Sequence, residues 1–346
     1  MLAKRSTAAI LALLGALTLT SCDALCPPLP VSGTVAPQPK PPAAPGYPVT
    51  ITNCGRDYRF DQPPKRVVVT GDSVAEVSSI LALGLGDRIV ANTQKRESAD
   101  QPDRDTAIAA LPAGGIATGA GRPVPRDTMM NLKPDLVLAA DNHDFSTADG
   151  AAGREQLAAV GANSYLPDPA CTPAAPGANP TIDDSYTLLR DLGRIFGVSD
   201  RAERLITDSE HLVGDMSNLV AGLPPANVLL VRSVEPGGRV TAAATGVWND
   251  VLARAGGANV VADASPGPLT TVSSRDLAAT KVDAVIITGA TQAGARDQAE
   301  TLFARYPQWQ AAKDERYLGL ADSYDLGPDN AIAVDRLARL LHPGAC

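Results

Sequence analysis

Polar side chains able to bind a small molecule follow short apolar runs at several points along the chain. In the first half of the chain these residues are Thr70, Gly71, Asp72, Ser73, Gln94, Lys95, Arg96, Asn142 and His143. In the second half they are Arg232, Trp248, Thr288, Gly289 and Tyr324. A few hydroxyl, amide and charged groups placed beside an apolar body are typical of a ligand site.

Gly71 and the residues after it have two interpretations. A glycine lets backbone approach a ligand closely, and the helix expected after it offers free N–H groups. Alternatively, Asp72 or Ser73 caps that helix without touching a ligand. Lys95 and Arg96 likewise either pair with an anionic ligand or remain solvated surface charges.

His143 lies between carboxylates in the segment Asp141–Phe145. A histidine beside two carboxylates can form a metal site. The chain has only three histidines, however, and His211 and His342 stand in unrelated helical contexts. We therefore predict no metal site and no cofactor. Asn142 and His143 are expected either to contact a ligand or to form a solvated loop.

The second-half candidates have competing interpretations as well. Arg232 ends the apolar run VLLVR, where its charge needs a partner, either a ligand anion or an internal carboxylate. Trp248 begins a helical stretch and either stacks on a flat ligand or packs in the core. Tyr324 and Asp325 follow the last apolar run and either close the rim of a site or form a turn before the final helix.

The sequence contains none of the common catalytic or nucleotide-binding motifs. G-x-S-x-G, H-E-x-x-H and G-x-x-x-x-G-K-[ST] are absent, and the glycines at 115, 119 and 121 lack dinucleotide spacing. A formal net charge of −8 without basic runs argues against nucleic-acid binding. We therefore predict a binding protein and not an enzyme.

The elements that would position these residues alternate between short apolar strands and amphipathic helices. Strands are expected at residues 66–70, 89–92, 135–140 and 163–166, and helices at 74–83, 127–132 and 154–160. Continuous apolar strands that alternate with helices indicate a parallel sheet covered on both faces.

The pattern changes after residue 180. Two consecutive helical stretches, 182–196 and 200–220, follow without a strand between them. The alternation then resumes, with strands expected at 228–232, 239–243, 260–261, 283–288 and 317–321, and helices at 248–255, 273–279, 296–303 and 331–341. The sequence thus predicts an α/β fold with mainly parallel sheets in two lobes, 49–180 and 225–346, joined by a helical connector at 181–224.

Residues 1–21 resemble a lipoprotein signal peptide. An uncharged apolar run at 7–19 is shorter than the roughly 20 residues of a spanning helix. The sequence Leu-Thr-Ser-Cys ending at Cys22 resembles the bacterial lipobox, which implies lipid attachment to Cys22. The proline-rich residues 22–48 predict an extended tether. We expect a lipid anchor in the cell membrane with the folded part on its extracytoplasmic face; an ordinary secretory signal is the alternative.

Seven successive segments resemble the substrate-binding proteins of iron-siderophore, haem and vitamin B12 ABC importers. They are Pro63–Val69, Ser73–Ala91, Asn131–Ala140, Leu192–Ile206, Thr245–Asp263, Ser273–Gly289 and Tyr306–Leu320. The resemblance covers about residues 51–343. It implies two lobes bridged by a long backbone helix, with a ligand held at the carboxyl ends of the strands, where the polar residues above lie. Thr288 and Gly289 resemble a cleft loop of this family.

The resemblance also implies partners. Glu76 and Asp250 stand where family members carry acidic residues that dock on permease arginines, although Asp250 is shorter than the usual Glu. We expect a monomer that captures a small iron chelate, a ferric siderophore, and delivers it to an ABC transporter permease. Vitamin B12 or haem as cargo, or an envelope scaffold or sensor, are the alternatives. For an anionic siderophore, Arg232, Lys95 and Arg96 are the expected binding cations.

The cysteines predict a disulfide. If Cys22 carries lipid, four cysteines remain, and none has the C-x-x-C spacing of a metal site. Cys54 lies in a hairpin turn, NCGRD, and Cys171 follows the last strand of the same lobe. We predict that these two residues pair, and leave the pairing of Cys26 and Cys346 open.

Overall fold

The computed structural model describes residues 44–94, 102–116, 122–171, 180–235, 238–262, 264–265 and 267–345. The predictions for Cys22, Lys95 and Arg96, for the signal peptide and for most of the tether therefore lie outside the described residues. We call residues 44–171 lobe 1 and residues 226–345 lobe 2. Among the described helices, none is both long enough and apolar enough to cross a membrane.

Lobe 1 contains a four-stranded sheet that is parallel throughout. Its strand order is β4-β3-β5-β6. The strands are β3 (Val67–Thr70), β4 (Ile89–Asn92), β5 (Leu136–Ala139) and β6 (Asn163–Tyr165). Every residue of β3 and β5 is buried, because helices and loops cover both faces of the sheet. Because the four strands are parallel, their carboxyl ends all lie at the same edge of the sheet.

Short helices surround this sheet. They are α1 (Ala75–Ala82), α2 (Pro102–Ala109), α3 (Arg126–Asn131) and α4 (Arg154–Ala159), with single turns η1 (Gly86–Arg88), η2 (Asn142–Phe145), η3 (Thr147–Asp149) and η4 (Asp168–Ala170). The sequence predicted α1, α3 and α4 but not α2. Most of α1 is buried, so it is a core element.

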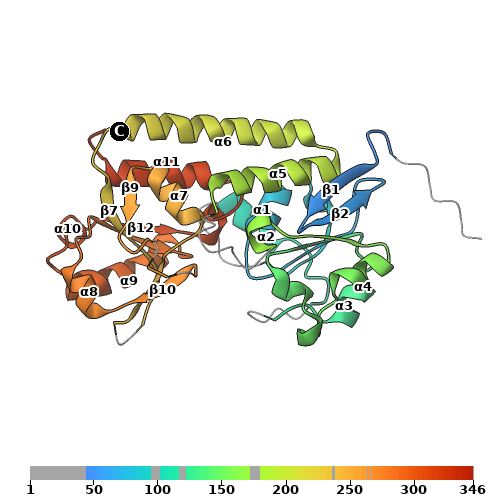
Figure 1. The fold of residues 1–346 in the computed structure, drawn as a ribbon, viewed down its shortest axis with the longest axis horizontal. Helices are drawn as coiled ribbons and strands as arrows, with labels where there is room; N and C mark the ends of the chain where they lie inside the picture. The colour runs from blue at the N-terminus through green and yellow to red at the C-terminus, as the bar shows by residue number, and fades with distance from the viewer. Residues whose placement is uncertain are drawn as a thin grey trace, which may run out of the picture. The chain divides into compact units, whose positions relative to one another are not determined.

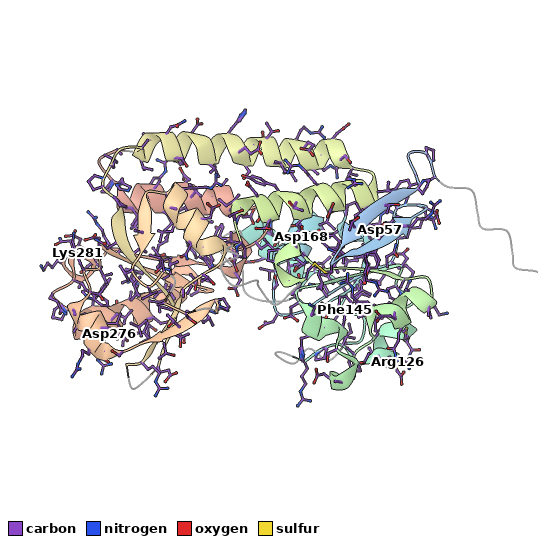
Figure 2. All side chains as sticks on the ribbon, in the orientation of Figure 1. Asp57, Arg126, Phe145, Asp168, Asp276 and Lys281 are labelled. Atoms are coloured by element: carbon purple, nitrogen blue, oxygen red, sulfur yellow. A yellow bond between two sulfur atoms is a disulfide. The ribbon has the colours of Figure 1, made fainter. Side chains whose placement is uncertain are left out.

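A hairpin precedes the sheet and carries the disulfide. Strands β1 (Val49–Asn53) and β2 (Arg56–Phe60) pair antiparallel around a turn that contains Cys54. Cys54 is bonded to Cys171, directly after η4, with 4.9 Å between the two Cα atoms. Figure 2 shows this bond in yellow within lobe 1. The predicted Cys54–Cys171 disulfide is therefore confirmed.

Three helices connect the two lobes. Helices α5 (Ile182–Phe196) and α6 (Ser199–Val220) follow one another, and α6 packs on both α5 and the last helix, α11 (Asn330–Leu341). Figure 1 shows α6 extending over these two helices. Apolar residues of all three belong to one continuous core that also includes β3 and β11. This shared core ties the lobes to each other.

Lobe 2 contains a mixed sheet. The order is β10-β8-β7-β11-β12, and β9 also pairs with β7. The strands are β7 (Ala226–Val234), β8 (Val240–Ala243), β9 (Gly257–Asn259), β10 (Leu269–Val272), β11 (Ala284–Thr288) and β12 (Tyr317–Leu320). β7, β9, β11 and β12 are parallel, while β8 and β10 form an antiparallel edge. The predicted α/β fold with mainly parallel sheets is confirmed, with this edge as an addition.

The helices of lobe 2 pack on this sheet. They are α7 (Val247–Arg254), α8 (Ser274–Ala279), α9 (Gln292–Arg305) and α10 (Gln310–Lys313), with one turn, η5 (Asp322–Tyr324). A separate apolar core lies beneath α8, α9 and α10 and contains Trp309 stacked on Tyr306, with 4.4 Å between ring centroids. The strand expected at 260–261 is wrong: β9 lies slightly earlier, where its backbone pairs with β7.

Candidate functional site

Three strand ends of lobe 1 bring polar side chains together. Thr70 ends β3, Thr93 follows β4, and Asp144 lies in η2 after β5. The Thr93 hydroxyl donates to Thr70 Oγ1 at 3.3 Å, and Thr70 Oγ1 lies 3.5 Å from Asp144 Oδ1. Carboxyl ends of parallel strands are the usual ligand side of an open α/β sheet. The structure therefore gathers Thr70 with neighbours that the sequence placed far apart.

Gly71 makes this gathering possible. Its φ is +104°, and a Cβ on it would lie 2.4 Å from Asp144 Oδ2 and 2.5 Å from the Cβ of Ala140. Only glycine tolerates both the positive φ and this close approach. The space that Gly71 leaves open is filled by the Asp144 carboxylate, so Gly71 admits a protein side chain here.

Gln94 bonds within the protein in this structure. Its Nε2 donates to the Thr70 carbonyl at 2.9 Å and to Glu76 Oε2 at 2.6 Å, and its Oε1 accepts from the Val77 N–H at 3.1 Å. Asn92 is fully buried. Its Nδ2 donates to the Gln94 carbonyl at 2.9 Å, and its Oδ1 accepts from the Gln94 N–H at 3.0 Å. Gln94 thus joins β3, β4 and α1, and its side chain is only 1% exposed.

Glu76 does not lie on the surface, as docking on a permease requires. It is 1% exposed and bonded to Gln94. Burial, with a small contribution from the charge of Asp144 and opposed by hydrogen bonds, raises the pKa of Glu76 to about 7. Because α1 is covered along most of its length, this structure does not present Glu76 to a partner, and its docking role stays a prediction.

Asp144 is the carboxylate that the sequence placed near the site without assigning it a role. It is 6% exposed, and its Oδ2 makes no hydrogen bond. Burial, followed by the neighbouring charge of Asp141, raises the pKa of Asp144 to about 6. A buried carboxylate oxygen without a partner is uncommon and calls for an explanation.

The other lobe 1 candidates lie at the rim. Asp72 is exposed, and Ser73 Oγ accepts from the Ala75 N–H at 3.0 Å just before α1, although the N-cap residue of α1 is Val74 and has no side-chain cap. Asn142 donates to the carbonyls of Ala170 and Cys171 at 3.0 and 3.2 Å. It therefore ties the η2 rim to the disulfide.

His143 is the histidine of the rim. It is about half exposed, and its Nδ1 lies 3.3 Å from Asp149 Oδ2. Its backbone N–H donates to Asp141 Oδ1 at 2.7 Å, and Asp141 is the N-cap residue of η2. Among the described residues, no group of three or more His, Cys, Asp or Glu side chains is placed to hold a metal ion.

In lobe 2, Arg232 already has a carboxylate partner. Its Nη1 donates to Asp322 Oδ1 at 2.6 Å, across the ends of β7 and β12. Gly289 makes room for the guanidinium, because a Cβ there would lie 2.0 Å from Arg232 Nη1. Of the two partners expected for Arg232, the internal carboxylate is present in this structure, and its contact with a ligand stays a prediction.

A second acid accompanies this pair. Burial, followed by the charge of Asp322, raises the pKa of Asp325 to about 7, although Arg232 opposes the shift. Asp325 is partly buried and comes directly after η5. At this edge Arg232 is bonded to Asp322, and its charge also acts on Asp325. The sequence indicated Asp325, beside Tyr324, as a rim residue but did not single out Asp322.

Three remaining candidates are mostly internal. Thr288 is 3% exposed, and its hydroxyl donates to the Val231 carbonyl at 3.2 Å. Trp248 is 6% exposed and packs in the core, as its alternative interpretation held. Tyr324 is 1% exposed and receives a hydrogen bond from Arg336 at 3.3 Å, so it belongs to the base of the rim.

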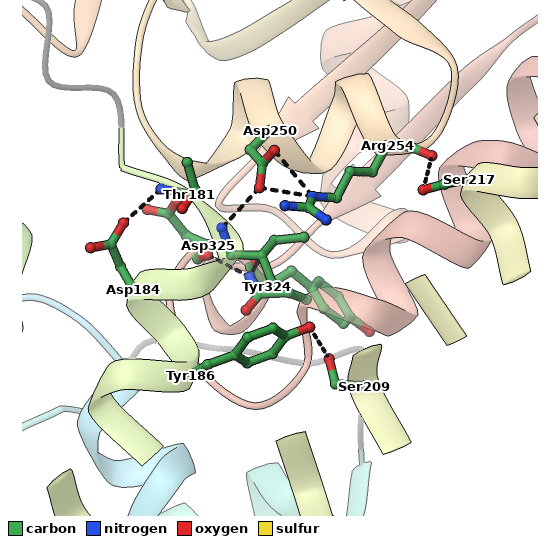
Figure 3. A network of polar contacts seen from close by, with 11 residues as sticks. Thr181, Asp184, Tyr186, Ser209, Ser217, Asp250, Arg254, Tyr324 and Asp325 are labelled. Carbon is green, nitrogen blue, oxygen red and sulfur yellow. Dashed lines mark hydrogen bonds and ion pairs between the residues drawn. The ribbon is translucent and has the colours of Figure 1, made fainter. Parts of the chain in front are cut away.

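Asp250 holds one helix to another. Its Oδ2 accepts from the Ile182 N–H, the first of α5, at 2.9 Å, and both its oxygens accept from Arg254 Nε. Figure 3 shows Asp250 between Arg254 and the start of α5. A carboxylate at a helix N-terminus is favourable. Since both oxygens are engaged within the protein, the structure assigns Asp250 to capping and does not test its docking role.

Residues of lobe 2 touch lobe 1 close to these sites. Arg104 on α2 bonds to Asp329 at 2.8 Å, with exposed side-chain fractions of 19% and 4%. Gly327 donates to Ser185 Oγ at 3.0 Å, and a Cβ on it would lie 3.6 Å from Ala75. These contacts join lobe 2 to α2, to α5 and to the start of α1.

A hollow of about 480 Å³ lies elsewhere. It is lined by residues 45–50 of the N-terminal segment and by the turn between α5 and α6, including Arg194 and Asp200. None of its lining residues is one of the candidate residues at the strand ends. We therefore place the candidate site at the strand ends and not in this hollow.

Comparisons with known proteins agree with the fold. A periplasmic binding protein from Veillonella parvula has a TM-score of 0.70 and 20% identity, covering 85% of this chain and 97% of that one. A protein of an ABC-type Fe3+-hydroxamate transport system from Saccharomonospora viridis gives 0.65 and 24%, with 85% and 99% covered. A periplasmic haem-binding protein from Roseiflexus sp. RS-1 gives 0.62 and 21%, with 82% and 99% covered.

The sequence itself matches a family model. No curated relative matches the chain. The family model described as periplasmic binding protein matches residues 67–319, from the first strand of the lobe 1 sheet to the last strand of lobe 2. That match covers most of the chain and includes both sheets and the connecting helices. The chain belongs to the periplasmic binding protein family.

Proposed function

We propose that this protein is a lipid-anchored extracytoplasmic receptor that captures a ferric siderophore between its lobes and delivers it to an ABC transporter permease. The observation that carries the proposal is the family match over residues 67–319 together with polar strand ends in both lobes. The Saccharomonospora viridis neighbour, from an Fe3+-hydroxamate transport system, supports iron chelates as the cargo class.

The receptor mechanism follows from the two lobes. Each lobe is a rigid sheet with its ligand-side edge at the carboxyl ends of the strands, and the shared core through α5, α6 and α11 keeps the lobes coupled. Helix α6 is one continuous element of 22 residues, which favours small lobe movements. A permease would recognise the loaded state through the charged surfaces of both lobes.

A binding panel tests the cargo. Equilibrium dialysis against ferric hydroxamates, ferric catecholates, haem and cobalamin, read by visible absorbance, avoids dependence on the two buried tryptophans. We expect micromolar or tighter binding of one ferric siderophore class. Binding of cobalamin alone would replace siderophore by the vitamin, and binding of none would favour the scaffold or sensor alternative.

Haem is the second candidate cargo because of one side chain. His143 is about half exposed at the rim, and Asp149 lies 3.3 Å from its Nδ1. A histidine whose second nitrogen is held by a carboxylate is suited to axial ligation of haem iron. The haem-binding neighbour from Roseiflexus sp. RS-1 has the same fold. Haem titration of the wild type and of His143→Ala tests this alternative, since loss of a Soret shift in the variant alone would support it.

The anchor has its own test. Replacing Cys22 by Ala removes the residue that would carry lipid, and the protein should then move from the membrane fraction to the soluble fraction. A Cys26→Ala variant is the matched control, because it removes a nearby cysteine outside the lipobox and should stay with membranes. Retention of the Cys22→Ala protein on membranes would contradict the lipid anchor.

A further inference from the structure

The contacts between the lobes described above come from a short loop of lobe 2. Residues 325–329, which we call the 325–329 loop, join η5 to α11 and follow the carboxyl end of β12. The loop meets α1 and α2, the helices that come after β3 and β4 in lobe 1, and α5 of the connector. Elements that follow ligand-side strand ends in the two lobes are therefore held together here.

A buried ion pair holds this loop to lobe 1. Asp329 Oδ2 accepts from Arg104 Nη1 at 2.8 Å, and the Asp329 side chain is only 4% exposed. Asp329 is the N-cap residue of α11, but its side chain makes no capping bond. Among the described residues, Arg104 is therefore the one side chain that compensates this carboxylate, and it comes from the other lobe.

The ion pair only partly offsets the burial of Asp329. Burial raises the pKa of Asp329 to about 6, although the charge of Arg104 opposes the shift. A buried carboxylate that loses its bonded cation keeps the full cost of its burial, and only hydration can then compensate it. Moving the 325–329 loop away from lobe 1 would admit the water that this needs.

The other contacts of the loop across the lobes are neutral. The Gly327 N–H donates to Ser185 Oγ at 3.0 Å, and Gly327 passes Ala75 at a φ of +134°, which L side chains rarely adopt. Leu326 adds partly buried apolar packing. Within the described parts of the chain, loss of the Arg104–Asp329 pair thus removes the loop's one charge-assisted bond to lobe 1.

We propose that the Arg104–Asp329 ion pair is a latch: it holds the 325–329 loop against α1, α2 and α5, and the loop separates from lobe 1 when the pair is broken. The inference goes beyond the proposed receptor function, because it concerns how the lobes are held together without cargo. Helix α6 packs on both α5 and α11, so the lobes stay joined when the latch is open. The latch therefore governs a local opening beside the strand ends and not a parting of the whole lobes.

Hydrogen–deuterium exchange followed by mass spectrometry tests the latch in the full chain without cargo. Backbone amides exchange when the structure around them opens, so peptides that cover residues 322–332 report separation of the loop. In Arg104→Ala these peptides should exchange at least about thirtyfold faster than in the wild type, because Asp329 is left buried without a cation. Peptides of β11, inside the lobe 2 sheet, should keep the wild-type rate, since a local opening leaves that sheet intact.

A double variant and a matched control isolate the buried charge. In Arg104→Ala/Asp329→Asn the charge is removed together with its partner, so exchange at residues 322–332 should be only about threefold faster than in the wild type. Arg56→Ala is the control, since Arg56 pairs with Glu155 inside lobe 1 and both side chains are well exposed. It removes a paired arginine away from the loop and should leave exchange at residues 322–332 unchanged.

Asp329→Asn alone covers the case in which Arg104→Ala does not fold. It breaks the ion pair without leaving an unpaired carboxylate in the loop, and the Arg104 side chain, at 19% exposed, can reach solvent. Exchange at residues 322–332 should rise about threefold, with β11 unchanged. The same rate in Asp329→Asn as in the wild type would count against the latch.

Three results with Arg104→Ala would overturn the proposal. Unchanged exchange at residues 322–332 would show that the ion pair does not hold the loop. Equal acceleration at β11 would show that the pair stabilises the whole fold and not the contact between the lobes. A double variant that exchanges as fast as Arg104→Ala would contradict the role of the buried charge. Because no cargo is present, the test stands even if the proposed receptor function fails.

Discussion

The two lobes place acidic groups at equivalent strand ends and neutralise them differently. In lobe 1, Glu76 and Asp144 are buried among hydroxyls and an amide, and no guanidinium is bonded to either in the described residues. In lobe 2, Arg232 is bonded to Asp322, and its charge acts on Asp325 without a bond between them. The acids of lobe 1 are therefore buried without a bonded cation, whereas lobe 2 has one ion pair beside an acid whose pKa is still raised.

The difference extends to the scaffolds. Lobe 1 has an all-parallel sheet stapled by the Cys54–Cys171 disulfide, and lobe 2 has a mixed sheet without a disulfide among its described residues. The disulfide restrains the chain at the end of η4, and Asn142 of η2 donates hydrogen bonds to the carbonyls of Ala170 and Cys171 there. A covalent restraint near buried, unneutralised carboxylates fits an edge that must stay organised before its cargo arrives.

The largest expected effect comes from removing the staple of lobe 1. The Cys54→Ala/Cys171→Ala double variant frees a loop with a sequence separation of 117 residues. We expect a loss of about 2–5 kcal/mol in the free energy of unfolding. Urea unfolding followed by circular dichroism measures the loss.

Tryptophan fluorescence follows lobe 2 alone, because Trp248 and Trp309 both lie there. Since a continuous apolar core joins the lobes, both signals should shift to lower urea together. A shift in circular dichroism without a shift in fluorescence would show that the lobes unfold independently. An unchanged midpoint in both signals would contradict a stabilising disulfide.

A smaller effect is expected from filling the glycine space of lobe 1. Gly71→Ala introduces a Cβ at 2.4 Å from Asp144 Oδ2 and 2.9 Å from the Ala140 backbone nitrogen, at a positive φ. We expect a loss of about 2–4 kcal/mol, combining backbone strain and overpacking. Thermal unfolding measures it.

Gly289→Ala is the matched variant in lobe 2. Its φ is also positive, at +73°, but its nearest neighbour is the end of the Arg232 side chain at 2.0 Å. A flexible guanidinium can move, whereas the backbone beside Gly71 cannot. Gly289→Ala should therefore cost less than Gly71→Ala. The reverse order would contradict the contrast between a rigid and an adaptable edge.

The sequence predicted the elements whose own residues carry the signal. The run Ile89–Asn92 and the helix Ile182–Phe196 have the bounds that periodicity indicates, because apolar burial decides both. Helix α2 was missed because its residues are mostly polar. Strand β10 was missed because its burial alternates between exposed and intermediate on an edge, without a buried apolar run. The strand near β9 was predicted too late in the sequence, because pairing with β7 determines its position and its own apolar residues do not.

The site was predictable only in outline. Strand ends identified Thr70, Gly71 and Arg232 as edge residues, and the structure places them there. The partner of Arg232 lies 90 residues away, and no local pattern reveals such a contact. The open bonding position of Asp144 depends on burial by several elements. Whether these residues bind a ligand stays a prediction.

The acid pair of lobe 1 predicts a pH effect on stability. The pKa values of Glu76 and Asp144 are raised to about 7 and about 6, above their ordinary values. A raised carboxyl pKa means that the folded state holds protons that the unfolded state has released. The contribution of these two carboxyl groups to the free energy of unfolding is therefore fully present below about pH 4 and is lost as the pH rises through about 6–7.

Glu76→Gln sharpens this prediction. The amide keeps an acceptor for Gln94 and removes the charge. At pH 8 the variant should be more stable than the wild type by about 1–3 kcal/mol, and at pH 4.5 the two should be nearly equal. Urea unfolding at both pH values measures this. Asp325→Asn in lobe 2 should gain at least as much at pH 8, because the pKa of Asp325 is raised to about 7 from a lower ordinary value even with Arg232 nearby.

The smallest expected effect concerns the compensated pair of lobe 2. The side chains of Arg232 and Asp322 are 31% and 17% exposed, so solvent screens their attraction. A double-mutant cycle with Arg232→Ala and Asp322→Ala should give a coupling free energy of about 0.5–1 kcal/mol, and 0.5 M salt should reduce it. The Arg104–Asp329 pair, at 19% and 4% exposed, is the control cycle and should couple more strongly. If the Arg232 cycle gave the larger coupling, the lobe 2 edge would be a tightly built ion pair. The contrast between a solvent-screened ion pair in lobe 2 and buried carboxylates without a bonded cation in lobe 1 would then be wrong.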